Sequence, residues 1–355
     1  MAFFDSLSQL CDVWKELERS SVPVYIYGTG NGCEGLFSLF KAKNITPSGI
    51  IVSDDHSKKK EFLGLKTITV SELESTVDKC TIALAFGTDI PQVMQRIDRL
   101  DDRYDLFVPE MSVADDTCFE KDFFLSDIEN AKKAYSLLSD DRSRQVFEAL
   151  CRFKITGRLS HLRPVFTTPG QSYKDILHLS GDEIYMDMGA YNGDTVKEFL
   201  SYTGGSYEHI YCFEPDMRNF RKCVKNLSHL DSIDFVNAAA WSFDTTLAFS
   251  SSSGRQSAVS SSGRLTSARS ADSFLAGREV TYIKYDVEGA DVPALLGSRR
   301  TINKYYPKIC TAAYHRPYDF YKLILLINDI APGYNFYLRQ YPYYPCWETN
   351  IFAVR

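Results

Sequence analysis

The chain has 355 residues, of which 44% are hydrophobic and 24% charged, and its formal net charge is −6. This length predicts two domains, and the composition is that of a globular protein. The acidic balance argues against a nucleic-acid-binding protein, and no apolar run approaches the roughly 18 residues that a membrane span needs. We therefore expect a soluble, cytoplasmic protein with no nucleic-acid or membrane partner.

Nine cysteines stand singly between Cys11 and Cys346, with no CxxC pair among them. Disulfide scaffolds and zinc ribbons need close or regular spacing, so neither is supported. We expect reduced, mostly buried thiols.

The first segment of the chain predicts an amphipathic helix. It has acidic residues inside its apolar stretch and no basic start, which argues against a signal peptide. The apolar positions that recur at helical spacing are Phe4, Leu7, Leu10, Val13, Trp14 and Leu17.

From about residue 22 to residue 108, strand patterns alternate with helical patterns, which predicts a parallel, doubly wound sheet. A glycine-rich turn follows the first strand, and acids end the second strand, as in a nucleotide-binding fingerprint. The residues concerned are Gly28, Gly30, Gly32, Gly35, Asp54 and Asp55. A domain that binds a nucleotide or nucleotide-sugar and a domain that serves packing or oligomerisation both remain open.

The middle of the chain shows helical periodicity and no strand signal, so we expect a helical connector there. Ser139, Asp140 and Asp141 can cap one of its helices. Strand–helix alternation resumes at Glu183, and two last strands flank a Pro- and Tyr-rich loop. The expected units are an N-terminal Rossmann-like domain, a helical connector and a C-terminal domain, with boundaries at 1–111, 112–180 and 181–355.

A serine-rich segment, residues 250–273, interrupts the C-terminal pattern. We expect an excursion within that domain, partly β, because strands resume directly after it. Its arginines, Arg255, Arg264 and Arg269, have a setting that can bind phosphate, although a solvated loop is the simpler interpretation.

The segment MDMGAYNGDT, residues 186–195, is the strongest local signal. A strand delivers Gly189 to its carboxyl end and Gly193 permits a tight turn into a helix, as in the first turn of nucleotide-binding α/β folds. Tyr191 stands where a dinucleotide site has its central glycine, which favours S-adenosylmethionine, a ligand without a pyrophosphate, over NAD. Glu214 ends the next strand, where an acid can accept both ribose hydroxyls.

A third motif, YIKYDVEGAD at 282–291, brings Asp286 and Glu288 to the same edge of the sheet. A carboxylate there can act as a general base, hold a divalent metal or orient a substrate. His315 and Asp319 follow the next strand. One Asp and one His do not establish a metal site, so metal dependence stays open.

In this order, the segments MDMGAYNGDT, FEPD, NAAAWS, IKYDVEGAD, AAYHRPYD and YLRQY resemble the FkbM-type methyltransferases over roughly residues 115–355. The fold we expect is therefore α/β: two doubly wound Rossmann-like domains, the C-terminal one a class I seven-stranded methyltransferase fold, joined by a helical connector. The resemblance implies S-adenosylmethionine as cofactor. It also implies O-methylation of hydroxyls on sugars, glycans or polyketide-derived compounds, as in bacterial surface-polysaccharide pathways.

The resemblance also assigns the site. Three residues are expected to face the acceptor as the catalytic group: Asp286, Glu288 and His315. By the same resemblance, four residues are expected to line the cofactor: Asp187, Gly189, Gly193 and Glu214. We expect further cofactor contacts from residues beside them or after the following strand: Ala190, Tyr191, Asp194, Thr195, Pro215, Asn237 and Ala238.

Two other classes of protein stay open. An NAD-dependent oxidoreductase or epimerase would use Gly28–Gly35 and needs an acid–base pair such as YxxxK, which does not stand out. A non-catalytic nucleotide-sugar-binding protein would keep the glycine turns but has no need for Asp286, Glu288 and His315 at one sheet edge. The sequence leaves open the acceptor, its linkage to a nucleotide, and self-association into a homo-oligomer.

Overall fold

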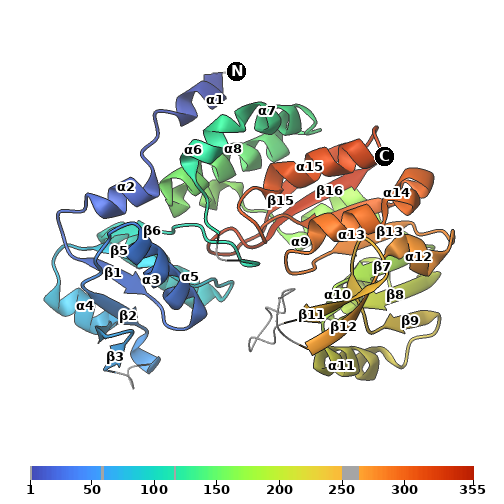
Figure 1. Ribbon diagram of the computed structural model, residues 1–355, viewed down its shortest axis with the longest axis horizontal. Coiled ribbons are helices and arrows are strands. Elements are labelled where there is room, and N and C mark those ends of the chain that lie inside the picture. The colour runs from blue at the N-terminus through green and yellow to red at the C-terminus, as the bar shows by residue number, and fades with distance from the viewer. Residues whose placement is uncertain (1, 57–59, 116, 250–263) are drawn as a thin grey trace.

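The computed structural model describes residues 2–56, 60–115, 117–249 and 264–355. Two α/β lobes lie side by side, with a group of helices between and above them in the view of Figure 1. We call them the N-terminal lobe, built on β1–β6, and the C-terminal lobe, built on β7–β16.

The N-terminal lobe contains one sheet in the order β3-β4-β2-β1-β5-β6, parallel except for the β3–β4 pair. Its strands are β1 (Val24–Tyr27), β2 (Gly49–Val52), β3 (Glu61–Phe62), β4 (Leu65–Thr69), β5 (Thr81–Leu84) and β6 (Asp105–Phe107). The helices between them are α3 (Asn31–Ala42), α4 (Val70–Thr76) and α5 (Pro91–Arg103). The predicted doubly wound sheet is confirmed, and β3, β4 and β6 are additions to it.

The N-terminal segment forms two helices, α1 (Ala2–Leu7) and α2 (Val13–Glu18), so the prediction of one amphipathic helix was wrong. Asp12 is the reason for the break. It has an extended backbone, and its Oδ1 accepts hydrogen bonds from the backbone N–H groups of Trp14 (2.8 Å) and Lys15 (3.4 Å). An aspartate in this N-cap position starts a new helix because it satisfies amides that have no partner inside the helix.

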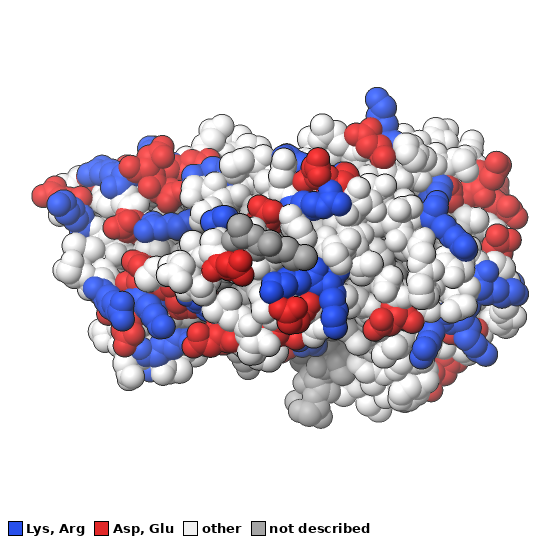
Figure 2. Space-filling model, turned by 90° about the horizontal axis from the view of Figure 1, so that it is seen from above, with Lys and Arg blue, Asp and Glu red and all other residues white. Residues whose placement is uncertain are grey.

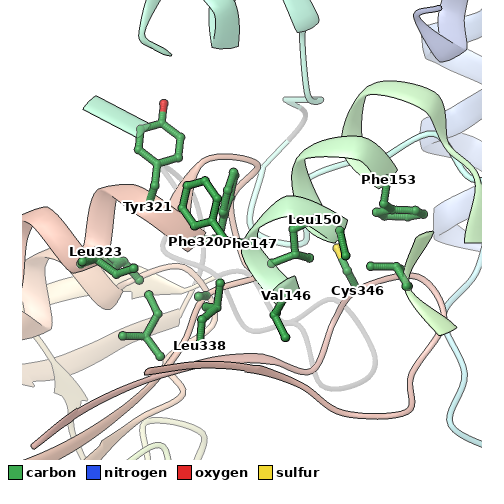
Figure 3. Close-up of a cluster of buried hydrophobic side chains, with 14 of the residues drawn as sticks. Val146, Phe147, Leu150, Phe153, Phe320, Tyr321, Leu323, Leu338 and Cys346 are labelled. Carbon is green, nitrogen blue, oxygen red and sulfur yellow. The ribbon is translucent and has the colours of Figure 1, made fainter. Parts of the chain in front are cut away.

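The middle segment is helical, as predicted, with α6 (Lys121–Ser126), α7 (Ile128–Ser136), α8 (Asp141–Thr156) and α9 (Pro169–Ser172). Asp140 caps α8, since its Oδ1 accepts a hydrogen bond from the Ser143 N–H at 2.8 Å. Figure 3 shows Val146, Phe147 and Leu150 of α8 among buried side chains from the C-terminal lobe. The apolar face of α8 thus belongs to the core of the protein.

The C-terminal lobe has a seven-stranded sheet in the order β15-β16-β14-β13-β7-β8-β9. Its strands are β7 (Ile184–Met188), β8 (His209–Phe213), β9 (Ile233–Val236), β13 (Tyr282–Tyr285), β14 (Lys308–Ala312), β15 (Asn335–Gln340) and β16 (Thr349–Val354). β16 runs antiparallel between β14 and β15, and β7, β8, β9, β13 and β14 are parallel to one another. The helices are α10 (Asp194–Tyr202), α11 (Met217–Leu227), α12 (Ala271–Leu275), α13 (Asp291–Gly297), α14 (Arg299–Tyr305) and α15 (Asp319–Ile330).

Where the segment 250–273 is described, from residue 264 on, it forms β12 (Arg264–Arg269) and the first residues of α12, so it is partly β as predicted. β12 pairs with β11 (Thr245–Phe249) and with β10 (Ala239–Ala240). Arg255 lies outside the described residues, as does the side chain of Arg264. The Arg269 Nε lies 3.7 Å from Asp244 Oδ2, so this arginine already has an acidic partner.

One cluster of buried apolar side chains runs from the N-terminal lobe through the connector into the C-terminal lobe, for example through Leu106, Phe147 and Phe320. The lobes are therefore packed together, and the boundaries 1–111, 112–180 and 181–355 remain a prediction. Seven of the nine cysteines are buried and all are free thiols. None of the described helices is long and apolar enough to cross a membrane. On the face shown in Figure 2, acidic and basic side chains are interspersed.

Candidate functional site

A cavity of about 780 Å³ lies at the carboxyl edge of the C-terminal sheet. Its wall is formed by residues at or just beyond the ends of four adjacent parallel strands: Gly189 after β7, Glu214 after β8, Asp286 after β13 and Tyr314 after β14. Ligands bind at this edge of open α/β sheets. The N-terminal lobe contributes Asp89, which follows β5, and the segment after that lobe contributes Ala114.

The glycine turn forms one side of this pocket. Gly189 has φ +140°, and a side chain there would collide with the backbone carbonyl oxygen of Asp286, so only a glycine fits. Gly193 has φ +87° and begins α10, where a Cβ atom would lie 2.7 Å from Leu227 Cδ1. Gly189 lines the pocket, whereas Gly193 shapes the turn behind it.

Glu214 links the glycine turn after β7 to the end of the neighbouring strand β8. Its two carboxylate oxygens accept hydrogen bonds from the backbone N–H groups of Tyr191 (2.9 Å) and Asp216 (2.8 Å). Burial raises the pKa of Glu214 to about 8, although both amides favour the charged form. Asn237 holds the same loop from behind, because its Nδ2 donates to the carbonyl oxygens of Glu214 (2.8 Å) and Pro215 (3.2 Å).

Asp187 lies beneath the turn. It is fully buried and accepts a hydrogen bond from the hydroxyl of Thr195. Burial raises the pKa of Asp187 to about 6. The predicted cofactor residues therefore fall into two groups. Those that line the pocket are Gly189, Tyr191, Asp194, Thr195, Glu214, Pro215 and Ala238; those that support it from behind are Asp187, Ala190, Gly193 and Asn237.

Asp286 is the centre of a polar group directly beside the glycine turn, since its backbone carbonyl oxygen is the atom that a side chain on Gly189 would meet. Lys284 Nζ lies 3.3 Å from its Oδ2, and the Tyr314 hydroxyl donates to its Oδ1 at 3.2 Å. Burial acts to raise the pKa of Asp286, but the positive charges of Lys284 and His315 outweigh burial and hold it well below its usual range. Asp286 is thus a carboxylate with donors on both oxygens.

His315 lies behind Asp286 rather than at the pocket surface. The side chain is fully buried, with Nε2 at 3.3 Å from Asp286 Oδ1 and Nδ1 at 2.8 Å from Asp291 Oδ2. Burial acts to lower the pKa of His315, but the carboxylates of Asp291 and Asp286 outweigh it and hold the pKa well above its ordinary value. Contrary to expectation, His315 does not line the pocket, whereas Asp286 and Glu288 do.

Sequence reasoning missed several pocket residues, among them Lys284, Glu348 and Glu198. Lys284 stands two positions before Asp286 on β13 and therefore shares its face, so the alternation of a strand could have found it. Glu348 comes from the loop between β15 and β16 and has no local signal. Burial raises its pKa to about 7, helped by the charge of Asp286. Glu198 on α10 also lines the pocket, and burial raises its pKa.

No group of three or more His, Cys, Asp or Glu side chains is spaced to hold a metal ion in the described part of the chain. The two residues considered as metal ligands, Asp286 and His315, instead contact each other, and both ring nitrogens of His315 face carboxylates.

The glycine turn of the N-terminal lobe is packed against protein. A Cβ atom on Gly28 would lie 2.6 Å from Phe86 Cδ1, and one on Gly32 would collide with the carbonyl oxygen of Ala85. Asp54 Oδ1 accepts a hydrogen bond from the Ser71 N–H at 3.0 Å. Close packing of helix and strand therefore accounts for two of these glycines.

Comparison with known proteins agrees with this geometry. Across 99% of this chain and 97% of the other, the fold is similar to the crystal structure of methyltransferase FkbM from Methylobacillus flagellatus KT, with a TM-score of 0.72 at 20% identity. Two weaker structural matches are Aeropyrum pernix fibrillarin with natively bound S-adenosyl-L-methionine and a SAM-dependent methyltransferase from Aquifex aeolicus. The first has a TM-score of 0.32 at 14% identity and covers 50% of this chain and 69% of the other. The second has a TM-score of 0.33 at 10% identity and covers 63% and 97%. A search of curated proteins finds no match.

The seven-stranded sheet with its antiparallel β16, and the pocket at its carboxyl edge, define a class I methyltransferase fold. Residues 187–336 match the sequence model of the methyltransferase FkbM domain. The C-terminal lobe therefore contains a region that is similar to an FkbM methyltransferase domain.

Proposed function

We propose that this protein transfers a methyl group from S-adenosylmethionine to a hydroxyl oxygen of a sugar, a glycan or a related natural-product acceptor. The observation that carries the proposal is the pocket itself, in which a nucleoside-type turn after β7 and a polar group around Asp286 after β13 lie next to each other. The turn fits the cofactor, and the polar group fits a hydroxyl compound.

The residues present fit an adenosyl group. Gly189 lines the pocket and carries no side chain, so a ligand can lie directly against the backbone of the turn. Glu214 lines the pocket at the end of the neighbouring strand, where a carboxylate can accept both ribose hydroxyls. Tyr191 has φ +46°, and its N–H is already bonded to Glu214, so the turn is shaped before any ligand arrives.

Asp286 is the residue that we assign to the acceptor hydroxyl. When bound, S-adenosylmethionine supplies an electrophilic methyl group. The oxygen that takes the methyl group must lose its proton as the new C–O bond forms. A carboxylate with a low pKa is a weak base toward a free hydroxyl, but the acidity of that hydroxyl rises steeply as the bond forms. Asp286 can therefore orient the hydroxyl first and accept its proton late.

The neighbours of Asp286 give it this role. Lys284 at 3.3 Å and the buried His315 at 3.3 Å keep it ionised and fix its rotamer. His315 is a positioning residue, because it does not line the pocket. Glu288 lines the acceptor side beside Asp286, and we assign it to binding of a second acceptor hydroxyl.

The experiment that tests O-methylation uses the full chain and S-adenosylmethionine labelled in the methyl group. Methylated products are collected from a panel of free sugars, methyl glycosides, aminosugars and phenolic compounds, and the labelled carbon is located by NMR. A methyl group on oxygen is expected. A methyl group on nitrogen or carbon as the main product would keep the methyltransferase class and contradict the acceptor chemistry proposed here.

A further inference from the structure

A contact between the two lobes lies next to the pocket. The loop after β5 pairs with the loop between β15 and β16, because the Thr88 N–H donates to the Tyr344 carbonyl oxygen at 2.7 Å and the Tyr344 N–H donates back at 2.9 Å. Trp347 lies so close to Gly87 that a side chain on this glycine would collide with the indole ring. Asp89, directly after this contact, lines the pocket.

A second contact fixes the same wall. The backbone N–H groups of Val113 (3.0 Å) and Ala114 (3.3 Å) donate to the carbonyl oxygen of His315, which also accepts from the Ser112 hydroxyl at 2.9 Å. Arg316 forms an ion pair with Asp115 and donates to the Gly289 carbonyl oxygen at 3.2 Å. The loops that carry Glu288 and Tyr314 are thus tied to the chain segment that leaves the N-terminal lobe.

The charges at this end of the pocket are mostly acidic. Asp89, Asp286, Glu288 and Glu348 line it. The two basic residues that line it among those the structure describes already have acidic partners: Lys284 contacts Asp286, and Arg316 contacts Asp115. Within the described ranges, the exposed Asp89 carboxylate has neither a hydrogen bond nor an ion pair. A phosphate group at this end would meet like charges at short range, whereas hydroxyl and ammonium groups would find acceptors.

We propose that the acceptor lies between the two lobes, that Asp89 is a specificity-determining residue which accepts a hydrogen bond from one of its hydroxyl or ammonium groups, and that the acceptor carries no phosphate. The inference rests on the proposed function and narrows it, because it sets aside nucleotide-linked sugars. According to this inference, the N-terminal lobe completes the acceptor side of the methyltransferase pocket.

Charge reversal at Asp89 tests the inference without knowledge of the natural acceptor. The full chain is first saturated with S-adenosylhomocysteine, and UDP-glucose is then titrated into the wild type, Asp89→Lys and Asp102→Lys by calorimetry. Asp102 is an exposed acid on α5 outside the pocket, so Asp102→Lys controls for the change in net charge. We expect a dissociation constant for UDP-glucose above about 1 mM for the wild type and for Asp102→Lys. Asp89→Lys is expected to bind UDP-glucose at least about tenfold more tightly.

Two results would overturn the inference. One is micromolar binding of UDP-glucose by the wild type, and the other is an Asp89→Lys protein that behaves like Asp102→Lys. Failure of the proposed function gives a different result, because S-adenosylhomocysteine would then not bind to the folded protein, or the labelled methyl group would be found on nitrogen or carbon. With an acceptor from the labelling panel, Asp89→Asn is further expected to raise KM about tenfold and to leave kcat nearly unchanged.

Discussion

The His315 Nδ1 lies 2.8 Å from Asp291 Oδ2, and both side chains are buried. This pair places a positive imidazolium directly behind Asp286. It explains how a carboxylate at the pocket wall stays ionised although burial opposes its charge. Asp291 thus acts on the site through His315, without lining the pocket itself.

Asp291→Asn is expected to lower the free energy of unfolding by about 3 kcal/mol, because it leaves a buried imidazolium with one partner fewer. The sign of the pH dependence follows from a folded-state pKa above the unfolded value. The stability contributed by His315 is complete below about pH 6.5 and is lost as the pH rises through the folded pKa. Urea unfolding from pH 6 to pH 9 measures both effects. Asp329→Asn, at an exposed site on α15, is the control, and an equal loss in the two variants would contradict the account.

Asp286→Asn is expected to lower kcat by about 10²–10⁴-fold, because the amide can neither accept the proton nor attract the acceptor hydroxyl as strongly. Affinity for S-adenosylhomocysteine should change little, since Asp286 faces the acceptor side. Turnover of the labelled methyl group measures kcat, and calorimetry measures the affinity for S-adenosylhomocysteine. Asp182→Asn, an exposed acid outside the pocket, is the matched variant. An Asp286→Asn enzyme with wild-type turnover would remove Asp286 from the catalytic group.

Binding of S-adenosylhomocysteine should tighten as the pH rises toward the Glu214 pKa of about 8. The reason is that ribose hydroxyls donate to the carboxylate form, and below this pKa each pH unit changes the affinity by at most about tenfold. Glu214→Gln should bind more weakly with a flat pH profile, and Glu214→Ala should bind weakest while remaining folded. Glu208→Gln, at an exposed position away from the pocket, should keep the wild-type profile. A pH-independent affinity in the wild type would remove Glu214 from the ribose site.

Lys154 and Glu110 form a buried ion pair, and removal of one partner should strongly destabilise the protein. Lys154→Met is expected to lower the free energy of unfolding by about 3–5 kcal/mol, because Glu110 is left buried without its cation. The double variant Glu110→Gln/Lys154→Met should recover much of this loss. Lys132→Met breaks a more exposed pair with Glu129 and should cost less than about 1 kcal/mol. Thermal unfolding of the wild type and the three variants measures the order of their stabilities. A Lys154→Met protein as stable as the wild type would contradict this prediction.

Gly189→Ala should destabilise the C-terminal lobe more than Gly30→Ala does. Both glycines have a positive φ, but a Cβ atom on Gly189 would collide with the Asp286 carbonyl oxygen, whereas nothing lies within 4 Å of one on Gly30. Backbone strain alone costs about 1–3 kcal/mol, and the collision adds to it only at Gly189. Equal unfolding free energies for the two variants would show that the turn can relax.

Much of the fold could be predicted from sequence because its signals are local. The α4 helix follows a Thr69–Glu72 capping box, and the buried strands β7, β8, β13 and β14 are short apolar runs. The strands β3 and β6 were missed because two or three residues are too few to show a period. The helix break at Asp12 was missed because apolar spacing continues across it.

The residues of the site also include some with a local sequence signal and some without one. The glycines and acids at strand ends predict the pocket, since the carboxyl ends of parallel strands meet at one edge of the sheet. The sequence could not show that His315 lies behind Asp286, because that depends on a carboxylate from α13. Nor could it show that Asp89 and Glu348 reach the same cavity, because they are brought there by packing between the lobes.

The most direct measurement is calorimetric titration of the purified full chain with S-adenosylhomocysteine and, separately, with NAD. Micromolar binding of S-adenosylhomocysteine, lost in Glu214→Ala but kept in Glu208→Ala, is the result that we predict. Binding of NAD to the folded protein without any binding of S-adenosylhomocysteine would contradict the account and would move the active site to the N-terminal lobe.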